Sequence, residues 1–235
     1  INIVLHKNAN NGFNGSLNTG LTYGENARFN GSLDLNYRQG KLNFYANLGT
    51  NFGKRENIND INLIGRDATQ FLDMLNDTES YLYKIGVDYF LDDNNTFSFY
   101  TNQNIYDGGL GATITATYLN NPANNFEQYL DLDLNNVNAS YNFAYKHLFP
   151  KEGHEILFEA DFNDFDGDED FAADFSNNAR FDSYAEIVKE ERSNVITNID
   201  YSLPIGERSK FEAGAEARIL TNTEDYDTNN PASQN

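Results

Sequence analysis

The sequence predicts an all-β fold of antiparallel transmembrane strands, about nine of them within 235 residues, that form part of a larger β-barrel. Three observations predict it. Apolar and polar residues alternate with a period of two, which gives each strand two different faces. Most alternating segments hold ten or more residues. Strands of soluble proteins usually run about 5–6 residues, whereas a tilted strand needs about 9–11 to cross a bilayer. After the first hairpin, whose connection (residues 24–28) is also short, short and long connections alternate, as they do in membrane barrels.

The composition excludes other classes of protein. Only 39% of the residues are hydrophobic, and the mean hydropathy is -0.65. No apolar run approaches the roughly 18 residues that a membrane helix needs. A net charge of -20 is typical of disorder, but 15 Tyr and 18 Phe at regular positions argue against it. A pI near 4.3 argues against a nucleic-acid partner, because binding phosphates needs clustered Lys and Arg. The absence of Cys excludes disulfides and thiolate sites.

Nine segments show the alternation in turn. In the fourth, Tyr81, Tyr83 and Ile85 alternate with Leu82 and Lys84. The expected strands cover residues 13–23, 29–38, 42–53, 80–91, 96–106, 136–148, 154–166, 193–203 and 210–221.

The connections fall into two kinds. Tight turns are expected at 39–41, 92–95, 149–153 and 204–208, and long polar loops at 54–79, 107–135, 167–192 and 222–235. Residues 66–76 place Phe71, Leu72 and Leu75 at roughly helical spacing, so we expect a short surface helix there. Residues 109–118 are expected to form either an extra hairpin or a strand extension.

The two faces of the strands differ in chemistry. One carries Phe, Tyr, Leu, Ile and Val, with aromatic residues near the strand ends, as in the aromatic girdles of membrane barrels. The other is rich in Asn, Ser, Asp and Gly, which suits a wet or plugged lumen. The alternative is a soluble all-β binding module whose sheet has one solvated face. Strand length and loop alternation favour the membrane. Because single-chain bacterial barrels have an even number of strands, we expect further strands after residue 235.

An acidic segment suggests a metal site. Asp164, Asp166, Asp168 and Asp170 alternate around Gly167 in an expected loop, as oxygen ligands do in calcium loops. The spacing does not match the EF-hand rule, since Gly167 follows the second Asp and no Glu occupies the twelfth position. The alternative is a solvated acidic loop that attracts divalent cations diffusely. No other cofactor is expected.

Catalytic motifs are lacking. There is no Gly-x-Ser-x-Gly, phosphate-binding loop or nucleotide fingerprint. His147 and His154 flank one turn, where they form either a weak metal pair or, more simply, interfacial polar residues. We therefore expect that the protein is not an enzyme.

Two phrases near the start carry a family resemblance. Residues 1–7 read Ile-Asn-Ile-Val-Leu-His-Lys, and residues 12–16 read Gly-Phe-Asn-Gly-Ser. Together they resemble the junction between plug and barrel in TonB-dependent outer-membrane receptors, specifically the N-terminal part of the barrel. His6 stands where that family usually has Lys. The strand–turn–strand phrase of residues 145–154 and the phrase 201–205 are similar to the outer-membrane β-barrel branch of these receptors.

The resemblance implies a domain organisation and a function. Residues 1–12 would be the end of a plug domain. Residues 13–235 would form part of a barrel in the bacterial outer membrane, and the whole barrel would have about 22 strands. Implied partners are outer-membrane lipid and lipopolysaccharide, the plug and a TonB-type energy complex, with a surface lipoprotein as a further candidate. The implied function is energy-coupled uptake of a scarce nutrient such as a siderophore, glycan or peptide. The alternative is a non-transport barrel that acts as a scaffold or adhesion subunit of an envelope complex.

Overall fold

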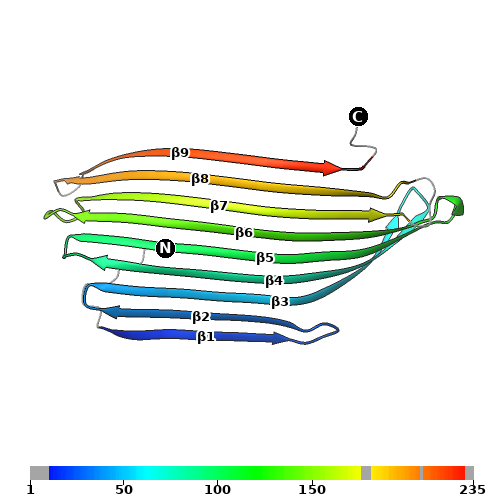
Figure 1. Ribbon diagram of the computed structural model, residues 1–235, viewed down its shortest axis with the longest axis horizontal. Coiled ribbons are helices and arrows are strands. Elements are labelled where there is room, and N and C mark those ends of the chain that lie inside the picture. Colours follow the sequence, from blue (N-terminus) through cyan, green and yellow to red (C-terminus); the bar gives the residue numbers. More distant parts are fainter. Residues whose placement is uncertain (1–10, 176–180, 207–208, 231–235) are drawn as a thin grey trace.

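The chain forms a single antiparallel sheet. The computed structural model describes residues 11–175, 181–206 and 209–230. Each strand pairs with its neighbours in sequence, so the spatial order runs from β1 to β9 (Figure 1). The strands are β1 (Gly12–Thr22), β2 (Arg28–Gln39), β3 (Leu42–Leu63), β4 (Ala68–Phe90), β5 (Asn95–Tyr118), β6 (Phe126–Leu148), β7 (Glu155–Asp174), β8 (Tyr184–Ile205) and β9 (Ser209–Thr228), with a 3-10 turn η1 (Pro122–Asn124). No helix in these ranges is long and apolar enough to span a membrane.

The nine predicted strands and their antiparallel order are confirmed. The strand ends that flank the four predicted tight turns lie at one end of the sheet, on the left in Figure 1, which we call the tight-turn end. The strand ends beside these turns match the predicted ends within two residues. The opposite end of the sheet, which we call the long-hairpin end, carries the connections β1–β2, β3–β4, β5–β6 and β7–β8.

The predicted long loops are wrong over most of their length. Strands β3 to β9 have 20–24 residues and continue through most of the segments expected to be loops. The helix predicted within residues 66–76 is also wrong, because β4 begins at Ala68. Phe71 and Leu72 point to opposite faces of β4, so the apparent helical spacing comes from apolar residues on both faces. The strand extension foreseen for residues 109–118 is confirmed.

Local hydrogen bonds hold the tight turns. At the β4–β5 turn, the Asp92 carboxylate accepts hydrogen bonds from the backbone amides of Asn94 and Asn95, both at 2.8 Å. The Asn94 backbone bond and the Asn95 side-chain bond lower the pKa of Asp92. At the β2–β3 turn, Gly40 has a φ of 56°, which a residue without a Cβ adopts at little cost.

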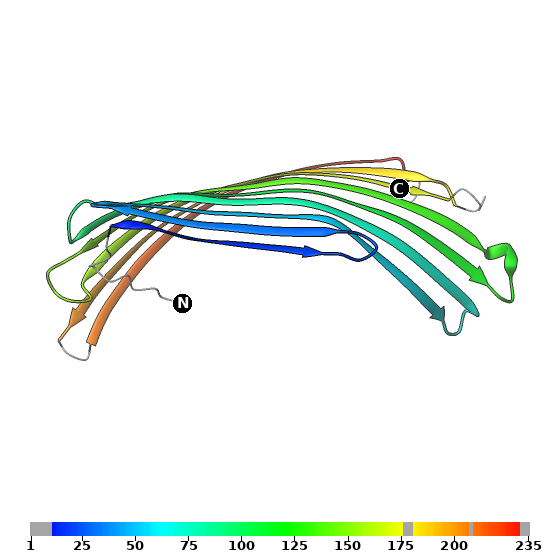
Figure 2. The same cartoon turned by 90° about the horizontal axis from the view of Figure 1, so that it is seen from below.

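The β1–β2 hairpin is shorter than its neighbours. Gly53 of β3 pairs with Arg28, the first residue of β2. Beyond Gly53, β3 continues to Leu63 and, among the described strands, pairs only with β4. Figures 1 and 2 show that β1 and β2 stop while β3 and β4 extend past them. This step in the sheet lies beside the pocket described below.

Residues that share a face at one end of the sheet can be followed along that face to the other end, because the eight strand pairings proceed without a slip in register. We call the face that carries Phe44, Leu48 and Phe52 the lipid-side face, and the face that carries Asn43 and Asn47 the lumen-side face. Figure 2 shows that the sheet is curved rather than flat.

The apolar band on the lipid-side face drifts across the strands. On β3 its last residue toward the long-hairpin end is Phe52, and on β9 it is Ile219. The row of paired residues that contains Phe52 reaches β9 at Asp225, six residues past Ile219, so the band shifts six residues over six strand steps. With about 3.3 Å per residue and about 4.8 Å between strands, this shift corresponds to a strand tilt of about 35°. Membrane barrels tilt their strands by about 35–45°.

The sheet has two free edges. Strands β1 and β9 each pair with one neighbour only among the described residues. Hydrocarbon does not tolerate an open sheet edge, because its unpaired N–H and C=O groups would have no partner. The nine described strands therefore do not form a closed barrel by themselves.

Candidate functional site

The lumen-side face within the apolar band is polar, and on β1 to β5 several of its side chains form hydrogen bonds between neighbouring strands. The Asp88 carboxylate accepts hydrogen bonds from Asn43 at 3.1 Å and from Ser98 at 2.7 Å, each on a neighbouring strand. Asp34 accepts one from Ser16 at 2.9 Å in the same manner. These cross-strand bonds meet the carboxylates' need for donors without apolar packing. The face is therefore built to contact water or another polar surface.

Most cations on this face also have partners. Lys84 lies over the ring of Tyr100, 4.0 Å from its centre, and Arg38 lies 4.3 Å from the ring centre of Phe90. A cation over an aromatic face is stabilised by the quadrupole of the ring.

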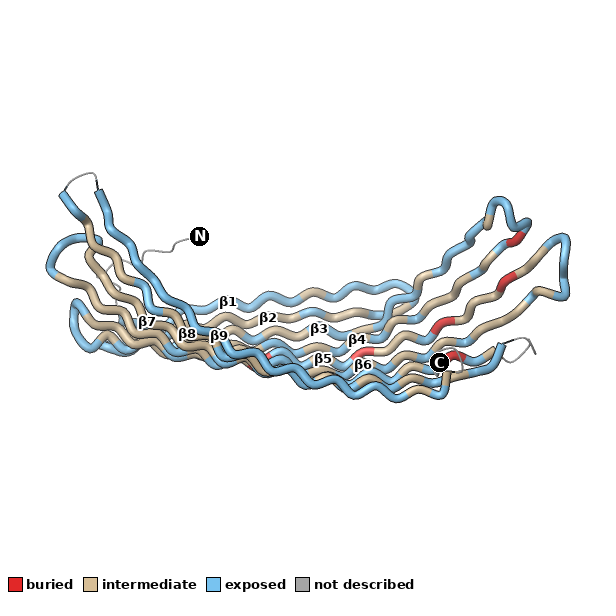
Figure 3. Tube along the Cα trace, turned by 90° about the horizontal axis from the view of Figure 1, so that it is seen from above, coloured by how far each residue is buried: buried red, intermediate tan, exposed pale blue. Residues whose placement is uncertain are grey.

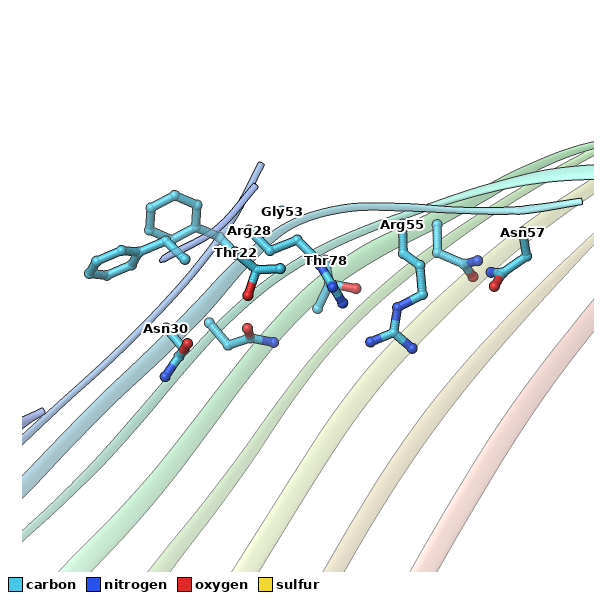
Figure 4. A pocket seen from close by; sticks show the side chains of 11 residues that line it. Thr22, Arg28, Asn30, Gly53, Arg55, Asn57 and Thr78 are labelled. Carbon is cyan, nitrogen blue, oxygen red and sulfur yellow. The ribbon is translucent and has the colours of Figure 1, made fainter. Parts of the chain in front are cut away.

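Two arginines differ from these cations. Arg28 and Arg55 line a cavity of about 480 Å³ at the step in the sheet, and neither forms an ion pair in the part of the chain that the structure describes. Figure 4 shows their side chains on the same side of the strands as Asn30 and Asn57. The cavity is lined by Thr22, Arg28, Phe29, Asn30, Asn51, Phe52, Gly53, Arg55, Asn57, Asn76 and Thr78, a set without a carboxylate.

Gly53 determines where Arg28 can lie. Its φ is 141°, a region that side-chain-bearing residues rarely adopt. A Cβ at this position would lie 2.6 Å from the Ala27 carbonyl oxygen and 2.8 Å from Cγ of Arg28. The missing side chain therefore leaves the space through which Arg28 reaches the cavity.

Beyond the apolar band, the two faces exchange character. On strands β4 to β7 the lumen-side face becomes largely apolar and the lipid-side face becomes largely acidic. The half-buried lumen-side residues that we call the apolar patch are Leu72, Met74, Leu110, Ile114, Leu130 and Leu132. The lipid-side acids at this level are Asp73, Asp77, Glu79, Asp107, Asp131 and Asp133. Of the five apolar residues that are buried in the described part of the chain, Ala68, Ala112, Ala116 and Ala173 lie on the lumen-side face here. Figure 3 shows most buried positions in this half.

The proposed calcium loop is not a loop. Asp164, Asp166, Asp168 and Asp170 lie on β7, exposed on the lipid-side face above the apolar band. Successive carboxylates on one face of a strand are about 6.6 Å apart and point in parallel, whereas calcium needs 6–8 oxygens at about 2.3–2.6 Å. Within the described ranges, no group of three or more acidic or histidine side chains is placed to hold a metal ion. Calcium binding remains a prediction that this geometry does not favour.

The two histidines of the β6–β7 turn are separated by an aromatic ring. The ring of Phe149 stacks on that of His154, with 3.9 Å between the ring centres. The same ring meets His147 edge-on, with 4.5 Å between the ring centres. His147 hydrogen-bonds to Asn95, and His154 to the hydroxyl group of Tyr201. The geometry thus matches interfacial polar residues rather than a pair of metal ligands. Residues 1–10, which hold most of the expected plug segment 1–12, lie outside the described residues.

The fold and the tilted apolar band define a β-barrel wall that spans a membrane. Residues 147–235 match the outer membrane protein beta-barrel family. The chain is a bacterial outer-membrane protein, with its aromatic and aliphatic face toward lipid.

Among solved structures, several outer-membrane proteins have a similar strand arrangement. They include the RagAB peptide importer in its open-open state (10% identity, 85% of this chain and 29% of that chain, TM-score 0.47). The CymD monoaromatic hydrocarbon channel is similar at 13% identity (90% and 76%, TM-score 0.34). BauA, the ferric preacinetobactin receptor from Acinetobacter baumannii, is similar at 10% identity (92% and 44%, TM-score 0.36). The chain thus spans less than a third of the importer chain. No curated protein matches the sequence.

Sequence reasoning missed the cavity with the two arginines and the apolar patch. The alternation of Leu130, Leu132 and Leu134 with Asp131 and Asp133 is as regular as that of any predicted strand, and it could have revealed the patch. No pattern in the sequence indicated the cavity, because Arg28 and Arg55 come together only through the pairing of β2 with β3.

Proposed function

We propose that this chain forms part of the wall of a TonB-dependent outer-membrane receptor that takes up a scarce nutrient by energy-coupled transport. The observation that carries the proposal is the polar lumen-side face, where a side-chain hydrogen bond joins each pair of neighbouring strands from β1 to β5 within the apolar band. A barrel with more than nine strands encloses more space than its own side chains fill. A polar wall around such a space suits either water or a polar plug.

The orientation follows from the connections. Barrels of this kind place short turns in the periplasm and long connections outside the cell. The long-hairpin end, with the apolar patch and the cavity of Arg28 and Arg55, would then face the medium from which a nutrient arrives. A surface lipoprotein above this end remains a candidate partner. The proposal includes no catalytic role.

Gene deletion tests the proposal. A strain that lacks the gene should lose growth on at least one limiting source of iron, glycan or peptide, and restoring the gene should restore growth. Uptake of that nutrient should stop when a protonophore collapses the proton gradient, because the receptor depends on an inner-membrane energy complex. Normal growth on every source, together with loss of an envelope complex that co-purifies with the protein, would instead establish the scaffold alternative.

A further inference from the structure

The two unpaired arginines lie close enough to act on one ligand. Arg28 is directly opposite Gly53 in the β2–β3 pairing, and Arg55 is two residues further along β3 on the same face. Diagonal neighbours of this kind lie roughly 7–8 Å apart, within reach of long side chains. Figure 4 shows both guanidinium groups on the cavity side of β3.

The surroundings of the pair leave its charge uncompensated. The chain carries 36 acidic and 16 basic residues, yet no carboxylate lines this cavity. Elsewhere, Arg192 pairs with Glu190 at 3.4 Å and Arg218 with Glu216 at 3.2 Å. Two guanidinium groups without an anion repel each other, and each presents a planar fork of donors that matches a carboxylate. The cavity is therefore complementary to an anion.

The apolar patch continues from the cavity in the same rows of residues. Arg55 pairs with Asn76, and the row continues to Leu110 and Leu132. Strands are about 4.8 Å apart, so Leu110 lies about 10 Å from Arg55 along the sheet. The next row joins Asn57, which also lines the cavity, to Met74.

We infer that this cavity is a binding subsite for the carboxylate of an amphipathic organic acid, whose apolar portion lies on the patch of Leu72, Met74, Leu110, Ile114, Leu130 and Leu132. Arg28 and Arg55 bind the carboxylate, and the Asn and Thr side chains around them supply further hydrogen bonds. Gly53 is a positioning residue, because its missing Cβ leaves room for Arg28. The inference deepens the proposed transport function and names the class of ligand that the receptor would select.

Equilibrium binding tests the inference without any need for transport. The full-length protein in lipid nanodiscs would be titrated with acetyl-trileucine, which has one carboxylate and an apolar body, and with the corresponding C-terminal amide. Calorimetry should show the acid binding at least tenfold more tightly than the amide, with an affinity that falls as salt rises. Equal binding of acid and amide, or no binding of the acid up to millimolar concentration, would overturn the inference.

Variants identify the groups responsible. Arg28→Gln and Arg55→Gln should each weaken binding of the acid about tenfold, and leave the weak binding of the amide unchanged. Arg66→Gln is the matched control, since Arg66 is exposed in the β3–β4 turn and does not line the cavity. Heat-modifiable gel migration would confirm that each variant is folded. Full affinity in the double variant Arg28→Gln/Arg55→Gln would overturn the assignment of the site.

Two further measurements separate the parts of the inference. Inorganic phosphate that competed as strongly as acetyl-trileucine would overturn the role of the apolar patch. A deletion strain with no uptake defect would contradict the transport function but would leave the binding result standing. Failure of the titration would, conversely, leave energy-coupled uptake of another class of ligand intact.

Discussion

In strands β4 to β7 the two halves of each strand face opposite environments, although the strand itself is continuous. In the half near the tight turns, the lipid-side face is apolar and the lumen-side face is polar; in the half near the long hairpins, this pattern is reversed. The ladders pass from one half to the other without a slip in register. The reversal therefore marks the place where the medium outside the sheet changes from lipid to water. In a barrel wall of this kind, the position of the membrane can be seen from the side chains, whereas the backbone pairing is the same inside and outside the membrane.

The largest expected effect is that of a charge on the lipid-side face within the band. Tyr141 lies near the middle of the band on β6, between Phe143 and Ala139. Tyr141→Arg should lower the free energy of unfolding from lipid vesicles by about 2–4 kcal/mol, because hydrocarbon does not solvate the guanidinium group. The measurement is equilibrium unfolding in denaturant.

Asn142, the residue next to Tyr141, provides the matched control, because the same charge would be placed on the opposite face of the strand. Asn142 lies on the lumen-side face opposite Asp161, so Asn142→Arg should change stability by less than about 0.5 kcal/mol. Equal losses in the two variants would show that the face assigned to lipid does not contact it.

The junction between the halves depends on a glycine. Gly53→Ala should cost about 1–3 kcal/mol, because the residue would retain a positive φ and its Cβ would meet the Ala27 carbonyl oxygen. Gly49, on the same face of β3, has no atom nearer than 3.6 Å to an added Cβ, and Gly49→Ala should stabilise by about 0.4–1 kcal/mol. Thermal unfolding of both variants measures the difference. A Gly53→Ala protein as stable as the wild type would mean that Arg28 is free to lie elsewhere.

In the half of the sheet near the long hairpins, we expect substitutions on the lumen-side face to lower stability more than substitutions on the lipid-side face. Leu132 is half-buried on the lumen side, between Leu110 and Phe171, whereas Asp133 is exposed on the opposite face. Leu132→Ser should cost about 1–2 kcal/mol through lost apolar contact, and Asp133→Ser less than about 0.5 kcal/mol. Denaturant unfolding of the pair measures this. A larger loss for Asp133→Ser would contradict the reversal of the faces.

The sequence predicted one half of this comparison well and the other half poorly. Near the tight turns, Phe and Tyr alternate with Asn and Ser, and Gly40 or Asp92 marks the turn, so strand ends could be placed within two residues. In the outer half, acidic residues replace the apolar ones on one face, and the segments were taken for loops. The regular Leu–Asp alternation of residues 130–134 still indicated a strand. No pattern along the chain could place Arg28 beside Arg55, because that contact depends on the pairing of two strands.

The smallest expected effect lies in a tight turn. Because backbone and side-chain amides of Asn94 and Asn95 bind the ionised form of Asp92, its pKa in the folded protein lies below the ordinary value of 3.8. A carboxyl group with a lowered pKa adds stability above its unfolded pKa, and that stability is lost as the pH falls through the folded pKa. The stability difference between wild type and Asp92→Ala should therefore be constant near neutral pH and should shrink below about pH 4. Unfolding measured from pH 7 to pH 3 tests this, and a difference that grew on acidification would show that the turn binds the protonated acid instead.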